Sequence, residues 1–212
     1  LFRILQGGRT AFSHEVRISA LQILAKYKLP YCIQPIIEQL PTLPVVEAKE
    51  FSALLNDFAG EIFDNRILKL LKQPDGKVRA AVIASLPGTR KKEFIKFIKE
   101  ALSDADPDVR IASIWALVDY EETKMLNQNF EMLRDPVERV RIAAAEALGI
   151  YAKADKLSNF SDLLKDENEV YEVKKSAIIG LSKSDQNKAV DILVELIDES
   201  ADLEEGAIKA LS

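Results

Sequence analysis

The stretch 135-DPVERVRIAAAEAL-148 contains a phrase that returns along the chain: an Asp, then Val-Arg, then a run of small and apolar residues ending at Leu. The same phrase occurs earlier as 106-DPDVRIASIWAL-117 and as 75-DGKVRAAVIASL-86. A leucine falls every 31 residues in two separate series. These series are Leu24, Leu55, Leu86, Leu117 and Leu148, and Leu40, Leu71, Leu102, Leu133 and Leu164. A fixed period of this length indicates a tandem repeat protein.

Each repeat has the pattern of two helices. In residues 107–118 small and apolar side chains follow the i, i+3, i+4, i+7 spacing of one helix face, and residues 121–133 carry a second stripe of this kind. Asp106-Pro107 and Asp135-Pro136 lie between repeats, where Asp suits the N-cap and Pro the first helical position. No segment alternates with the period of two that a strand requires, so the sequence predicts an all-α protein.

The phrase VRIAAAEALG at 140–149, closed by Leu164 and Asp166, resembles the HEAT-like repeat family in its short bacterial form, found in phycobilin lyases. This resemblance implies an α-solenoid of about six two-helix units, with first helices on the convex side and second helices on the concave side. We expect one array over 1–212, with partial helices at both ends and cut from a longer protein. Its units fall near 13–43, 44–74, 75–105, 106–136, 137–168 and 169–200.

Composition excludes several classes of protein. Apolar residues make up 48% of the chain and charged residues 30%, as in a globular protein. No apolar run approaches the roughly 18–20 residues that cross a bilayer, and the N-terminus lacks a secretory signal pattern. Cys32 is the only cysteine, which excludes a disulfide framework and favours a reducing compartment. We therefore expect a cytoplasmic protein, or the cytoplasmic domain of a membrane-tethered parent.

A cation recurs near the start of the first helices, where it opposes the helix dipole by about 0.3–1 kcal/mol. A repeated placement of this kind predicts a repeated compensating contact. We expect a ladder in which these cations pair with Asp104 or other Asp residues at the preceding junctions. Loss of one arginine should then cost stability rather than ligand binding. The predicted ladder consists of Arg17, Arg79, Arg110, Arg141 and Lys174 with Asp106, Asp135 and Asp166.

Residue types that carry catalysis are scarce in this chain. His14 is the only histidine and lies beside a predicted helix N-cap. One histidine and one cysteine cannot build a structural zinc site of the usual four ligands. Gly7-Gly8 does not complete a phosphate-binding glycine pattern. We therefore predict a non-enzymatic protein, with no metal and no cofactor.

Charge is unevenly distributed, and this asymmetry points to a binding surface. Residues 1–110 carry 17 Lys and Arg against 13 Asp and Glu, whereas 111–212 carry 12 against 21. The basic excess is concentrated in 90-RKKEFIKFIKE-100. We predict an interaction scaffold that binds an extended or helical protein partner. Its candidate contact residues are Lys92, Lys96 and Lys99 in one unit and Lys124, Asn127 and Gln128 in the next.

Trp115 departs from the repeat, because the positions one or more periods away hold small or polar residues. It is a candidate contact for a partner or for self-association, since buried tryptophans dominate many interfaces. The alternative is that Trp115 packs against the neighbouring unit.

Two further functions stay open. The phycobilin-lyase resemblance implies a tetrapyrrole-handling protein, which would form a coloured complex with a bilin. The lysine run permits nucleic-acid binding, but Glu121, Glu122 and Glu131 on the neighbouring second helix and a net charge of −5 disfavour it.

Overall fold

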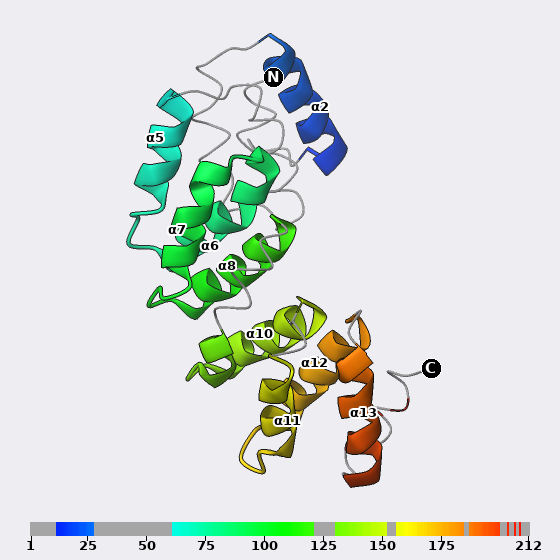
Figure 1. The fold of residues 1–212 in the computed structure, drawn as a ribbon. Coiled ribbons are helices and arrows are strands. Elements are labelled where there is room, and N and C mark those ends of the chain that lie inside the picture. Colours follow the sequence, from blue (N-terminus) through cyan, green and yellow to red (C-terminus); the bar gives the residue numbers. More distant parts are fainter. Residues whose placement is uncertain are drawn as a thin grey trace. The chain divides into compact units, whose positions relative to one another are not determined.

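A computed structural model of the chain describes residues 12–27, 61–120, 130–151, 156–184 and 187–199, together with Leu203, Gly206 and Ile208. These described residues form α-helices and short 3-10 helices, with no strand among them. The chain divides into two compact units, Leu1–Tyr120 and Glu121–Ser212 (Figure 1). Each unit is described by itself, and a single array across their boundary stays a prediction.

The first unit contains both kinds of helix that the repeat predicts. The first helices α6 (Gly76–Ser85) and α8 (Pro107–Asp119) pack against each other, and the second helix α7 (Ile95–Ala101) packs against α8. The second helix of the preceding repeat, α5 (Glu61–Leu70), contacts α6 (Figure 1). The unit also holds α2 (His14–Lys26), and the 3-10 helices η4 (Leu86–Thr89) and η5 (Lys92–Phe94) join α6 to α7.

The second unit repeats this arrangement. The first helices α10 (Glu138–Tyr151) and α12 (Tyr171–Ser182) pack along each other, and the second helices α11 (Ser158–Lys165) and α13 (Asn187–Glu199) both contact α12. Of the second helix predicted over 121–133, residues 121–129 lie outside the described residues. The part that follows forms the 3-10 helix η6 (Phe130–Arg134), which packs on α10.

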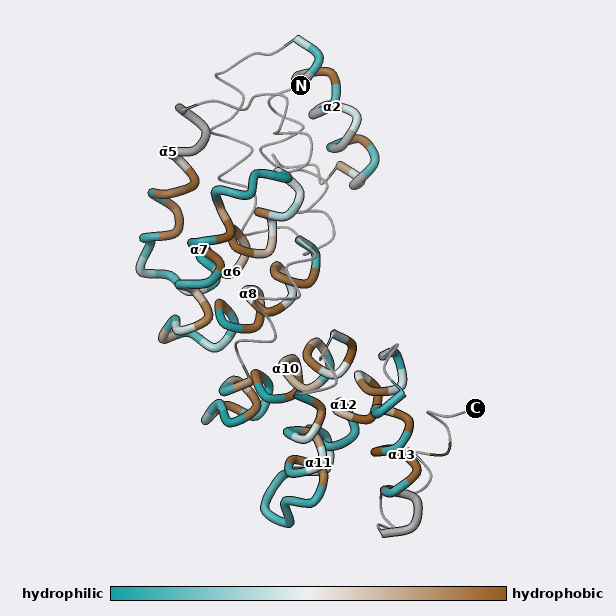
Figure 2. The backbone as a smooth tube through the Cα atoms, viewed as in Figure 1, coloured by the Kyte–Doolittle hydropathy of each residue, from teal (hydrophilic) through white to brown (hydrophobic). Residues whose placement is uncertain are grey.

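Six of the periodic leucines lie in the core, whereas Leu71 is half-buried. Leu86, Leu117 and Leu148 are at most 2% exposed, and Leu102, Leu133 and Leu164 are also buried. Apolar and polar residues alternate along the helices (Figure 2), the pattern of helices that bury one face. A single two-helix repeat cannot bury that face, and stacking of repeats provides the cover. The fold is therefore the all-α solenoid that the 31-residue period predicts.

Aspartates cap two of the first helices, α6 and α8. The helix after Asp135-Pro136 begins only at Glu138, and α12 has Val170 at its N-cap without a side-chain cap. Asp75 accepts a hydrogen bond from the backbone N–H of Lys77 at 2.9 Å, and Asp106 accepts one from that of Asp108 at 2.8 Å. These carboxylates satisfy backbone donors that have no partner within the helix.

Two glycines bring the backbones of α10 and α12 together. A β-carbon built on Gly180 would lie 2.6 Å from the carbonyl oxygen of Glu146 and 3.0 Å from the α-carbon of Gly149. A β-carbon on Gly149 would lie 2.8 Å from backbone atoms of Gly180. The atoms in the way belong to the backbone, so only glycine fits at this crossing.

Candidate functional site

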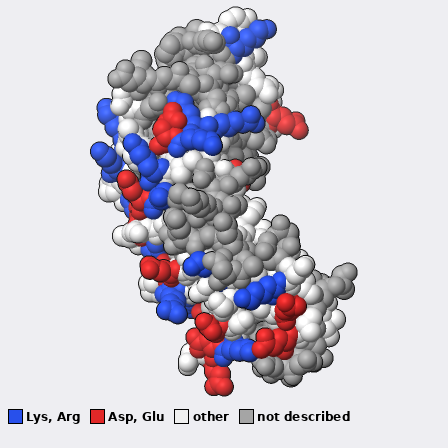
Figure 3. All heavy atoms as spheres, viewed as in Figure 1, with Lys and Arg blue, Asp and Glu red and all other residues white. Residues whose placement is uncertain are grey.

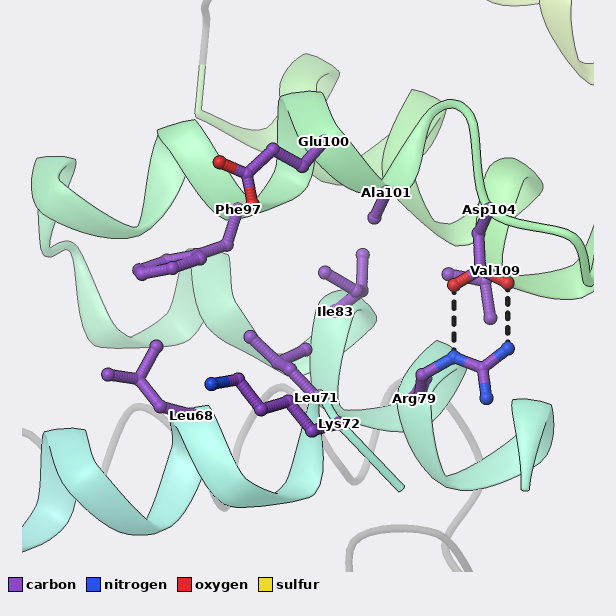
Figure 4. Close-up of a pocket in the computed structure, with 10 residues that line it drawn as sticks. All are labelled: Leu68, Leu71, Lys72, Arg79, Ile83, Phe97, Glu100, Ala101, Asp104 and Val109. Carbon is purple, nitrogen blue, oxygen red and sulfur yellow. Dashed lines mark hydrogen bonds and ion pairs between the residues drawn. The ribbon is translucent and has the colours of Figure 1, made fainter. Parts of the chain in front are cut away.

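A hollow of about 220 Å³, here called the first groove, lies between the successive second helices α5 and α7 (Figure 4). The side chains of Leu68 below and Phe97 above point into the space between these helices, and α6 supplies the back wall. Lys72 and Glu100 are exposed, whereas the apolar lining residues from α5 and α7 are half-buried. The lining consists of Leu68, Leu71, Lys72, Arg79, Ile83, Phe97, Glu100, Ala101, Asp104 and Val109.

Arg79 closes one end of the first groove. Its Nε and Nη2 donate to the two carboxylate oxygens of Asp104 at 2.9 and 2.7 Å, as Figure 4 shows. Its Nη1 donates to the carbonyl oxygens of Gln73 and Pro74 at 2.7 and 2.9 Å. One side chain thus ties the loop before α6 to the loop after α7, so the walls of the groove are held at a fixed separation.

The same pair fixes the ionisation of its members. The hydrogen bonds from Arg79 lower the pKa of Asp104 below its usual value, and those bonds raise the pKa of Arg79. Asp104 is therefore charged at neutral pH, and that charge is already used by Arg79.

A second groove, of about 400 Å³, lies between η6 and α11 in the second unit. Its lining positions lie 62 residues, two periods, beyond those of the first groove: Phe130, Leu133 and Arg134 succeed Leu68, Leu71 and Lys72. The two hollows are thus the same site of the repeat. Further pairs are Arg79 and Arg141, Phe97 and Asn159, Glu100 and Asp162, Ala101 and Leu163, and Asp104 and Asp166.

The second groove has different chemistry at the same position. Asn159 replaces Phe97, and the carboxylates of Asp135, Asp162, Asp166 and Glu169 line it beside only two arginines. The first groove balances two basic residues against two acidic ones around a largely apolar lining. The backbone is repeated, so the side chains decide what each groove can bind.

The predicted ladder residues lie at the ends of these grooves, and the carboxylate partners differ from the expected ones. Arg79 pairs with Asp104 at the junction after its helix pair, not at the junction before it. Arg141 donates to both carboxylate oxygens of Glu169, at 2.8 and 2.9 Å, where the prediction pointed to the aspartate of the preceding junction, Asp135. With Asp135 it makes a hydrogen bond to the backbone, from Nη1 to the carbonyl oxygen at 2.8 Å.

Arg110 and the ladder aspartates make local contacts. Arg110 is buried, and its Nη1 donates to the carbonyl oxygens of Asp104 and Ala105 at 2.8 and 3.2 Å. Arg17 and Lys174 are half-buried on α2 and α12. The aspartates accept a hydrogen bond from the backbone N–H two residues later, a role shared by Asp106, Asp135 and Asp166.

The predicted lysine contacts lie on the exposed side of η5 and α7, beside the first groove. Lys92, Lys96 and Lys99 are all exposed, and Lys96 holds its Nζ 4.7 Å from the centre of the Phe97 ring. Figure 3 shows Lys and Arg atoms gathered over the first unit in that view. Lys124, Asn127, Gln128 and Cys32 lie outside the described residues. Trp115 is half-buried on α8.

Tyr120, at the end of α8, holds the turn that leads into the lysine-bearing segment. Its hydroxyl lies 2.7 Å from the carbonyl oxygen of Leu86 and 3.1 Å from that of Lys91. Burial raises the pKa of the Tyr120 hydroxyl. Within this turn Arg90 has a φ of 54°, the left-handed conformation that disfavours side chains.

The part of the chain that the structure describes has neither a candidate metal site nor a candidate membrane span. It contains no group of three or more His, Cys, Asp or Glu side chains that could hold a metal ion. None of its helices combines the length and apolar character needed to cross a membrane.

Successive first helices pack against each other, and along the chain second helices follow first helices at a fixed period. This arrangement defines a helical-repeat protein. The model of HEAT repeats matches residues 65–149 and 126–212, and the chain belongs to this family. No curated protein matches the chain. An engineered protein has a similar solved structure, with 17% identity and a TM-score of 0.51 over 99% of this chain and 94% of that chain, which shows the fold alone.

Two natural proteins are more distantly similar. Human deoxyhypusine hydroxylase in complex with glycerol is 14% identical, with a TM-score of 0.40 over 99% of this chain and 93% of that chain. The complex of CpcE and CpcF of phycocyanin lyase from Nostoc sp. PCC7120 is 17% identical, with a TM-score of 0.39 over 98% of this chain and 90% of that chain.

The sequence did not single out the groove linings, although their signal was available. Leu71 and Leu133 belong to the periodic series, and reading off the residues beside each of them 62 residues apart would have revealed the paired sites.

Proposed function

We propose that the chain is a non-enzymatic scaffold that binds an extended or helical segment of another protein over its second helices. The observation that carries this proposal is the first groove, a half-buried apolar surface bordered by the exposed lysines of η5 and α7. A solenoid presents such a surface ready formed, so a partner is bound without the cost of ordering the scaffold.

Charge supports a protein partner with acidic character. Residues 90–100 contain five Lys and Arg against two Glu. Lys96 and Lys99 are three residues apart on α7 and so lie on one face of that helix, and Lys92 is exposed on η5 just before it. The proposed contact surface extends to Lys124, Asn127 and Gln128 of the next repeat and to Trp115.

A scaffold role also agrees with the supply of reactive side chains. The sequence holds one histidine and one cysteine, too few for most nucleophile–base pairs or zinc sites. We place the scaffold in the cytoplasm, because a single cysteine favours a reducing compartment.

The test is a pull-down from nuclease-treated lysate of the source cells, with bound proteins identified by mass spectrometry. We expect the wild type to retain a protein in stoichiometric amount, and a Lys92→Glu, Lys96→Glu, Lys99→Glu variant to lose it. The control reverses three exposed lysines elsewhere, Lys77→Glu, Lys156→Glu and Lys188→Glu, and so makes the same change in net charge.

The control variant should retain the partner, and circular dichroism should show unchanged helicity for both variants. An empty wild-type lane would contradict the scaffold. If the wild type and the Lys92, Lys96, Lys99 variant retain the partner equally, then these three lysines, the lysine face, do not take part in binding.

A further inference from the structure

We propose that the first groove receives one apolar side chain from an acidic segment of the protein partner. This inference rests on the proposed scaffold function and names the chemistry that the surface would recognise. The groove encloses about 220 Å³, below the roughly 300–1,000 Å³ typical of small-molecule sites. Its size therefore suits a single side chain better than a cofactor or metabolite.

The lining shows what kind of side chain fits. Leu68, Leu71, Phe97 and Ala101 are half-buried, so apolar surface from both helices stays in contact with water. Removing such surface from water is favourable in proportion to its area. The ion pair of Arg79 with Asp104 closes one end and leaves no unused charge there. An inserted apolar group would thus gain burial without stripping solvent from a free ion.

The second groove shows that the repeat does not require an apolar residue at the position of Phe97. Two periods later the residue at the position of Phe97 is Asn159, which also lines its groove. By contrast, the buried neighbour Ile98 corresponds to the buried Phe160, so apolar character is kept at that inward position and lost at Phe97. Phe97 is therefore not needed for stacking of the helices, and its place at a solvent-facing hollow is explained by a bound partner.

The lysines follow the same logic. Lys96 and Lys99 correspond to Ser158 and Ser161 in the second unit, so neither of these two lysines recurs there. Lys96 places its ammonium group over the Phe97 ring, and Lys72 is exposed on the opposite helix. Glu100 is the exposed carboxylate among the lining residues. The rim is thus predominantly positive, which favours Asp or Glu on either side of the inserted apolar residue.

A protein segment is favoured over nucleic acid at this surface. Nucleic acid would need several basic units in register to neutralise phosphates. Within residues 90–100 the basic residues are interrupted by Glu93 and Glu100, and the second unit offers serines at the corresponding lysine positions. A phosphate backbone would gain nothing from the apolar lining of the groove. An amphipathic protein segment would use both the apolar lining and the lysines of the rim.

The test is selection of a random peptide library displayed on phage against the whole chain, with depletion against Phe97→Asn. This substitution imports the residue that the second groove already holds, so we expect the variant to fold. Selected peptides should contain an apolar residue flanked by Asp or Glu. Their affinity, measured by fluorescence anisotropy with labelled synthetic peptides, should fall at least about tenfold for Phe97→Asn.

Two lysine variants test whether the positive charge at the rim of the first groove contributes to binding. Lys96→Ser should weaken peptide binding about two- to fivefold at low salt, with the difference disappearing at high salt because exposed charges are screened. The matched control, Lys156→Ser, changes an exposed lysine of the second unit and should leave the affinity unchanged.

Several outcomes would overturn the proposal. These are equal affinity of selected peptides for the wild type and Phe97→Asn, no enrichment at all, a consensus without acidic residues, or a single-stranded oligonucleotide that displaces the peptides at lower concentration. The scaffold function fails separately. A partner captured from lysate that depends on the lysine face but binds Phe97→Asn normally would keep the scaffold and reject the groove.

Discussion

The crossing of α10 and α12 predicts that Gly180→Ala destabilises the second unit. The new β-carbon would lie 2.6 and 2.9 Å from the carbonyl oxygens of Glu146 and Ala145 and 3.0 Å from the α-carbon of Gly149. Neither helix can relieve this overlap by rotating a side chain, so α12 must move away from α10. Overpacking of this kind costs about 1–3 kcal/mol, with backbone obstacles at the upper end, and better helix propensity returns about 1 kcal/mol. We expect a net loss of about 2 kcal/mol.

Urea denaturation followed by circular dichroism measures this loss as a lower midpoint at unchanged slope. The matched control is Gly206→Ala, because the one described atom that a β-carbon at Gly206 would meet is the Cδ1 of Ile178 at 3.7 Å, an ordinary contact. The same substitution should there be neutral or stabilise by up to about 1 kcal/mol. If Gly180→Ala is as stable as the wild type, the close approach of the two helices is not the reason for glycine at this position.

Three further predictions follow from the ion pairs and the turn. A double-mutant cycle on Arg79 and Asp104, whose side chains are 16% and 17% exposed, should give a coupling energy of about 1.5–3 kcal/mol. The exposed pair of Lys165 and Glu195, at 2.7 Å, should give about 0.2–1 kcal/mol. Equal coupling energies would contradict the role of burial. Because Arg79 lowers the pKa of Asp104, the contribution of this carboxylate is complete above about pH 4 and is lost as the pH falls through the lowered pKa, so thermal unfolding of Asp104→Asn should depend less on pH in that acid range than the wild type does. Arg90 has a left-handed backbone, so Arg90→Gly should have a free energy of unfolding about 0.5–1 kcal/mol higher than Arg90→Ala in urea denaturation, after the backbone entropy of glycine is deducted. The reverse order would show that the φ of 54° is not strained.

The features that the sequence predicted are those that every repeat must share. Leu86, Leu117 and Leu148 recur because each fills the same position between stacked helices, and burial at all three follows from the period. The aspartate caps were predictable for the same reason, since each first helix needs an acceptor for its unpaired N–H groups.

The contacts that escaped prediction depend on local departures from the period. Leu164 and Val173 are nine residues apart, whereas the corresponding Leu102 and Val109 are seven apart. The longer junction offers Glu169 in addition to Asp166, and Arg141 takes the glutamate. Gly149 and Gly180 are 31 residues apart, so the period pairs them along the sequence. The period does not indicate that their backbones meet, because that contact depends on how closely α10 and α12 cross.

The two grooves show how a repeat protein separates residues that serve the fold from residues that can serve a partner. Arg79 and Arg141 recur because each ties its own pair of loops, and each pairs with a carboxylate at the junction after its second helix. Phe97 and Asn159 line the same hollow in two folded units, so the fold accepts either residue. A residue that the fold does not require is available for binding, and comparison with the corresponding positions of the other repeats identifies it. By this reasoning the lysines and Phe97 of the first unit are stronger candidates for partner contact than the recurring arginines.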